Sequence, residues 1–161
     1  MTFQSTATNA VRRSPAVRGD DAWVARYLPV PFVEHGRAFR GADCRGLVFL
    51  ILEHEAGVRV PELAELIGNE HRSARDAAAL VQAHAGQWSR IEADAVGGYP
   101  RFCVLLFTVG GLPTHVAVSM GGRRFIHTQK GAGVRIGSLD EAEPGEGFWG
   151  SRLEGAYQYG V

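Results

Sequence analysis

The apolar and polar positions of this 161-residue chain divide it into a helix-rich first half and a strand-rich second half. Asp43 is a favourable N-cap residue, and Gly57 is suited to the position that follows a helix end. Between them, apolar residues recur at the spacings of one helical face, namely Leu47, Val48, Ile51 and Leu52. The pattern therefore predicts a buried helix that begins at Cys44 and ends near Gly57.

Further helices are expected on both sides of this one. Asp20 can cap a short amphipathic helix, after which Pro29 and Pro31 force the chain into an extended segment. Residues 61 to 86 are polar and helix-prone, and we expect them to form helices that cover one side of the core.

The second half has the pattern of a sheet. Residues 102–107 form a nearly continuous apolar run, as in a strand buried on both faces. Residues 114–120 alternate, which places His115, Ala117 and Ser119 on one face of the next strand. Additional strands are expected at 123–128, after a turn at Gly121-Gly122, at 134–136 and in the aromatic stretch 148–161. Helices followed by an antiparallel sheet predict an α+β fold.

Composition narrows the possible partners and cofactors. Acidic and basic residues number 17 each, so nothing favours nucleic acid or an anionic membrane as a partner. The two cysteines are far apart and no CxxC motif is present, so we expect neither a disulfide framework nor a metal site, and no cofactor. Residues 1–19 lack periodicity and an apolar signal-peptide core, which predicts a disordered tail, no signal peptide and a single domain at 20–161. No apolar run is long enough for membrane insertion.

Cys44 is the first candidate for chemistry. A thiol at a helix N-terminus feels the positive end of the helix dipole, which favours the nucleophilic thiolate. Most free cysteines, however, are inert buried residues, and this alternative stays open for Cys44 when it is considered alone.

A cysteine nucleophile also needs a base and a group that orients the base. His115 and His127 lie twelve residues apart on two strands of one predicted hairpin. The two rings share a face if the strand pairing centres on Gly121, whereas a two-residue turn at Gly121-Gly122 would place them on opposite faces. The sequence permits both registers. If the rings share a face, its small residues leave room for the helix that begins at Cys44.

Three segments together resemble a known family. PFVEHGR, GADCRGLV and HVAVSMGGRRFIHTQKGAGV are similar to motifs of the NlpC/P60 family of papain-like cysteine peptidases, most of all the branch found in bacteriophage tails and gene transfer agents. The resemblance covers roughly residues 20–161 and implies a papain-like fold in which the nucleophile helix packs on a central antiparallel sheet. It implies that Cys44 is the nucleophile, His115 the base and His127 the residue that orients the base.

The resemblance also implies a substrate and a location. Family members cut the stem peptides of bacterial peptidoglycan, so that peptide is the expected partner, together with phage-like tail proteins. The protein would then stay in the cytoplasm until it is assembled into a particle. The resemblance further suggests substrate contacts from Phe32, His35, Arg37 and Asp43, although loop residues that cap helix ends are an equally good interpretation of this segment.

Two positions depart from the family pattern. Phe32 stands where the family commonly has a tyrosine, and it has no hydroxyl with which to contact the substrate. Phe102-Cys103 replaces a usual Gly-Asp pair, so we expect a tight turn to be lost there and Cys103 to be a buried packing residue. Two alternatives to the peptidase hypothesis therefore remain: a catalytically weak structural protein of the tail tip, and a Cys-His amidase or acyltransferase with another substrate.

Overall fold

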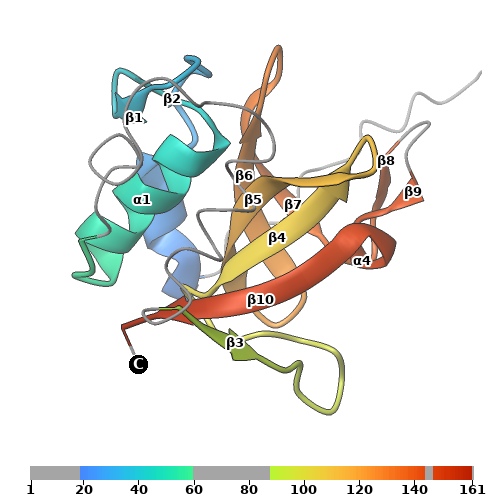
Figure 1. Ribbon diagram of the computed structural model, residues 1–161. Helices are drawn as coiled ribbons and strands as arrows, with labels where there is room; N and C mark the ends of the chain where they lie inside the picture. Colours follow the sequence, from blue (N-terminus) through green and yellow to red (C-terminus); the bar gives the residue numbers. More distant parts are fainter. Residues whose placement is uncertain (1–18, 60–87, 144–146, 161) are drawn as a thin grey trace, which may run out of the picture.

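The computed structural model describes residues 19–59, 88–143 and 147–160 (Figure 1). Its centre is a six-stranded antiparallel sheet with the strand order β3-β10-β4-β5-β6-β7. These strands are β3 (Trp88–Ile91), β4 (Val104–Val109), β5 (Leu112–Gly121), β6 (Arg124–Gln129), β7 (Gly133–Ser138) and β10 (Leu153–Tyr159). Helices combined with an antiparallel sheet confirm the predicted α+β fold.

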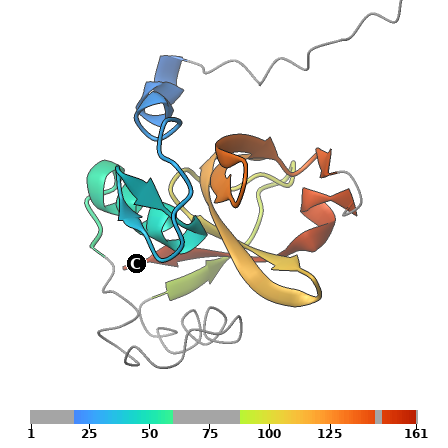
Figure 2. The same ribbon diagram turned by 90° about the horizontal axis from the view of Figure 1, so that it is seen from above.

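The remaining elements surround this sheet. They are the 3₁₀ helix η1 (Gly19–Arg26), helix α1 (Cys44–Glu55), helix α4 (Trp149–Arg152), and the short strand pairs β1 (Arg37–Ala38) with β2 (Gly41–Ala42) and β8 (Ala142–Glu143) with β9 (Gly147–Phe148). Both views place α1 and α4 on opposite sides of the central strands (Figures 1 and 2). The sheet therefore has two covered faces.

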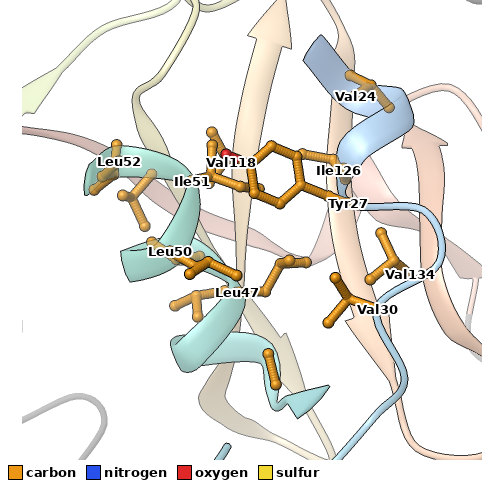
Figure 3. Close-up of a cluster of buried hydrophobic side chains, with 14 of the residues drawn as sticks. Val24, Tyr27, Val30, Leu47, Leu50, Ile51, Leu52, Val118, Ile126 and Val134 are labelled. Carbon is orange, nitrogen blue, oxygen red and sulfur yellow. The ribbon is translucent and has the colours of Figure 1, made fainter. Parts of the chain in front are cut away.

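Helix α1 has the bounds that its sequence predicts. Asp43 caps its N-terminus, Ala56 is its C-cap, and Gly57 follows with a φ of 66°. The apolar face of α1 packs against Val118 and Ile126 of the sheet, and Val24 of η1 and Tyr27, the residue after η1, close the same cluster (Figure 3). This cluster is the larger core of the protein.

A second, smaller core lies on the other face of the sheet. It contains Phe107, Ala117, Phe125 and Trp149, all at most 5% exposed. β4 contributes to both cores by alternation, since Val104 and Leu106 face α1 while Leu105 and Phe107 face α4. This two-sided burial confirms the interpretation of its continuous apolar run.

Several expectations change in the structure. The aromatic C-terminal stretch begins with the helical turn α4 rather than with a strand, and the strand starts only at Leu153. The turn expected to be lost before β4 is present, with Phe102 at a φ of 64°, a conformation in which glycine is unstrained. The predicted tail at 1–19 and the predicted helices at 61–86 fall outside the described residues, apart from Gly19, which belongs to η1.

Candidate active site

Cys44 is the first residue of α1, and the loop before it is held by one carboxylate. Asp43 Oδ1 accepts a hydrogen bond from the Gly46 N–H at 2.8 Å, and Oδ2 accepts one from the His35 N–H at 3.0 Å. Gly46 also lies so close to the Gly36 carbonyl that a side chain at position 46 would collide with it. Asp43 therefore ties the 35–36 loop to the start of the helix and sets the position of the thiol.

The surroundings of the thiol oppose its ionisation. Burial raises the pKa of Cys44, and the neighbouring Asp43 carboxylate acts in the same direction. A backbone hydrogen bond from Val116 and the Arg45 guanidinium lower the pKa, but their effects are smaller. The lowered pKa expected at a helix start is therefore not found: burial has the largest effect on the pKa of Cys44, and it favours the thiol over the thiolate.

The two histidines of the hairpin are in direct contact. His115 Nε2 lies 2.9 Å from His127 Nδ1, so one of these nitrogens carries the shared proton. If His115 donates it, His115 Nδ1 keeps a lone pair and can accept a proton from elsewhere. This is the tautomer that a general base requires.

A β-bulge places both rings on one face. The turn pairs Gly121 with Arg124, while the strands beyond it pair Ser119 with Phe125 and Val118 with Ile126. β5 thus contains one extra residue between Ser119 and Gly121. Both registers considered from the sequence were wrong: the two-residue turn is Gly122-Arg123, and only the bulge returns the histidines to a shared face.

Aromatic side chains enclose the histidine pair. The Trp149 ring centroid lies 5.4 Å from that of His115 and 5.0 Å from that of His127, and Phe107 and Phe125 contact the same rings. Burial is the main reason why the pKa falls from 6.5 to about 4 for His115 and to about 3 for His127. Both rings are therefore neutral at neutral pH.

The contact between helix and sheet differs from the one expected. Small residues on the His115 face were predicted to receive the helix that starts at Cys44. Instead α1 packs on the Val116 and Val118 face, and Ala117 lies in the second core near Trp149. Cys44 reaches β5 through its hydrogen bond with the Val116 backbone, at the residue that follows His115. The structure thus joins the two histidines directly, and it brings the Cys44 thiol to Val116, the residue after His115 on β5.

The predicted substrate residues lie along the segment that leads to Cys44. Phe32 forms a parallel bridge with Ala42, two residues before Cys44. His35 is exposed with a φ of 61°, and the Arg37 guanidinium lies 4.7 Å from the centre of the Phe49 ring. Substrate contact by Phe32, His35, Arg37 and Asp43 stays a prediction, and the hydrogen bonds of Asp43 show that it also has a structural role.

Trp149 is the site residue that the sequence analysis missed. Its stretch was predicted to be an aromatic strand, and only the fold brings it to histidines more than twenty positions away. The expectation for Cys103 is confirmed: it is 1% exposed, and burial raises its pKa to about 11. Cys103 lies in the second core, so the two cysteines occupy different environments.

Comparison with known proteins supplies the identity of the fold. The NlpC/P60 family model matches residues 29–153. The chain belongs to the NlpC/P60 family. This family match covers all of the candidate site residues, from Phe32 to His127, and Trp149 as well.

Solved NlpC/P60 structures agree with the architecture. The NlpC/P60 domain of peptidoglycan hydrolase SagA is 23% identical with a TM-score of 0.51, and the match covers 88% of this chain and 99% of that domain. An NlpC/P60 family protein from Bacillus cereus ATCC 10987 is 20% identical with a TM-score of 0.56, and the match covers 92% of this chain but 41% of that protein. At these identities the likeness shows the fold. No curated protein sequence matches the chain.

The described residues contain no helix with the length and apolar character needed to cross a membrane. No group of three or more His, Cys, Asp and Glu side chains in the described ranges could hold a metal ion.

Proposed function

We propose that this NlpC/P60 protein is a cysteine peptidase that hydrolyses the stem peptides of bacterial peptidoglycan with Cys44, His115 and His127. The observation that carries the proposal is the 2.9 Å hydrogen bond between His115 Nε2 and His127 Nδ1. The residue that follows His115 on β5 is Val116, whose backbone forms a hydrogen bond with the Cys44 thiol. A nucleophile, a base and a group that orients the base are the three parts that thiol-dependent acyl transfer needs. The family membership supports the substrate class.

The chemistry follows from the neutral resting state. His115 Nδ1 accepts the Cys44 Sγ–H proton as the sulfur attacks the peptide carbonyl carbon. The C–N bond then breaks, and the leaving amine takes its proton from His115. Water next attacks the acyl-enzyme with His115 as base, releasing the carboxylic acid and restoring the thiol. In this scheme the thiolate forms during attack rather than beforehand, in keeping with the raised pKa of Cys44.

The cysteines provide a matched test. Purified peptidoglycan is digested with the wild-type protein, Cys44→Ala and Cys103→Ala, and the released fragments are read by mass spectrometry. Wild type and Cys103→Ala, which keeps the Cys44 thiol, should release fragments cut within the stem peptide, while folded Cys44→Ala should release none. Equal cleavage by Cys44→Ala would refute the nucleophile.

Two observations favour a second candidate, a structural protein with weak or no catalysis. Phe32 lacks a hydroxyl, and burial keeps Cys44 protonated. If folded wild type releases no fragments, this candidate takes precedence, and Phe32→Tyr is the first reversion to test.

Capture of the acyl group by an added amine, in competition with water, would instead indicate an acyltransferase.

We also propose that the protein works as part of a phage-like tail. The resemblance of the PFVEHGR and GADCRGLV segments to the tail-associated branch supports this location. Particles would be purified by density gradient and probed with an antibody against the chain. Co-migration with tail proteins is the expected result, and exclusive recovery of the protein away from particles would contradict it.

A further inference from the structure

Trp149 covers the histidine pair from the side opposite α1. Its indole ring is 5% exposed and contacts both His115 and His127. Phe107 and Phe125 pack edge-on against the same indole, with centroids at 5.0 and 5.5 Å. Three aromatic side chains therefore pack against the two hydrogen-bonded histidines, of which His127 is buried and His115 half-buried.

The position of Trp149 is fixed by bonds that do not involve the histidines. The backbone N–H of Trp149 donates a hydrogen bond to the backbone carbonyl of Glu141 at 3.0 Å, which anchors the start of α4. From outside, the Arg152 guanidinium lies 3.9 Å from the centre of the indole ring. Arg152 is held by Glu143 at 3.0 Å, and Glu143 accepts a hydrogen bond from Gln129, two residues after His127. These contacts hold the indole in place against the histidine pair.

We propose that Trp149 is a positioning residue for the peptidase reaction: it excludes water from the His115–His127 hydrogen bond and holds His115 neutral and oriented to accept the thiol proton. This inference rests on the proposed function. An imidazole that is already protonated cannot serve as the base, so a dry cover extends the pH range in which His115 can act.

On balance, the charged groups around the two histidines also disfavour their protonation. Arg152 of α4 disfavours protonation of both rings, and Arg135 of β7 does so for His127. Glu143 of β8 favours protonation of His115, but burial has the larger effect on its pKa. Phe107 of β4 and Phe125 of β6 add apolar neighbours, one to each ring. Loss of the indole cover should therefore raise the pKa of both histidines.

The test compares Trp149→Leu with Trp149→Phe and with Phe148→Leu. Phe148 is the adjacent residue and is 55% exposed, so its replacement controls for a local change beside α4. In folded Trp149→Leu, NMR titration should show both histidine pKa values moving toward 6.5. The peptidase kcat should fall about tenfold with little change in KM, and the acid limb of the pH profile should move upward. Trp149→Phe keeps an aromatic cover and should retain most of the activity.

A measurement on wild type keeps the test decisive if Trp149→Leu does not fold. The proton shared by the two rings should be visible by NMR and exchange slowly with solvent. Rapid exchange in wild type, or wild-type histidine titration in folded Trp149→Leu, would overturn the proposal. The titration requires no turnover, so the absence of peptidase activity would refute the proposed function without deciding the role of Trp149.

Discussion

The pair formed by buried His127 and half-buried His115 should make the fold sensitive to mild acid. In the unfolded chain a histidine has a pKa near 6.5, whereas burial lowers the folded-state pKa to about 4 for His115 and about 3 for His127. Between these values the unfolded chain binds protons that the folded chain does not. The stabilising contribution is therefore present above pH 6.5 and is lost as the pH falls.

The size of the effect follows from the same values. Lowering the pH from about 7 to about 5 protonates each histidine in the unfolded chain and neither in the folded one. The free energy of unfolding should then fall by about 2 kcal/mol for each histidine. Stopping at about pH 5 limits the contribution of carboxylates, whose ordinary pKa values are about 4.

The assay is urea unfolding followed by tryptophan fluorescence at pH 7, 6 and 5, with His127→Gln as the test variant and His35→Gln as the control. His35 is exposed in the loop before α1, so its variant should keep the wild-type dependence on pH. His127→Gln should lose about 2 kcal/mol of that dependence. A wild-type stability that is unchanged between pH 7 and 5, or an unaltered slope in His127→Gln, would refute the reasoning.

Three further predictions concern the frame around the site. Gly46→Ala places a methyl group against the Gly36 carbonyl and should lower the free energy of unfolding by about 2 kcal/mol, measured by urea unfolding; a stable variant would show that the loop can move away. Ser119→Ala removes the hydroxyl that accepts a hydrogen bond from the Gly121 N–H at 3.1 Å. It should lower the free energy of unfolding by about 1 kcal/mol and shift the hairpin resonances in NMR. Unchanged spectra and stability would show that the bulge does not depend on this bond. In a variant without the second cysteine, alkylation of Cys44 should still accelerate at pH 9, because burial raises its pKa above 9.0, and a plateau near neutral pH would contradict this.

Local patterns were sufficient for the helix and for the central strands. The helical spacing of apolar residues after Asp43, together with Gly57, predicted α1, because a cap, an apolar stripe and a left-handed stop act within a few residues of one another. The apolar run of β4 and the alternation of β5 predicted two strands for the same reason. The candidates Cys44, His115 and His127 were also found from spacing and resemblance.

The register of the hairpin lay beyond local reasoning. A two-residue turn alone would have placed His127 opposite Val118 and turned it away from His115. The bulge between Ser119 and Gly121 reverses that outcome, and it forms where Ser119 bonds to Cys103, the residue before β4, as well as to the turn. Such a bulge depends on strand partners that are distant in sequence.

The sequence by itself indicated which residues are candidates for chemistry and which segments would be helix or strand. Only the tertiary structure decided their protonation and mutual orientation. Burial against the sheet makes Cys44 a resting thiol in spite of its place at a helix start. The packing of Trp149 from the far end of the chain keeps the His115–His127 pair neutral. The physical reason is that desolvation and ring contacts depend on what surrounds a group in space, which no local pattern records.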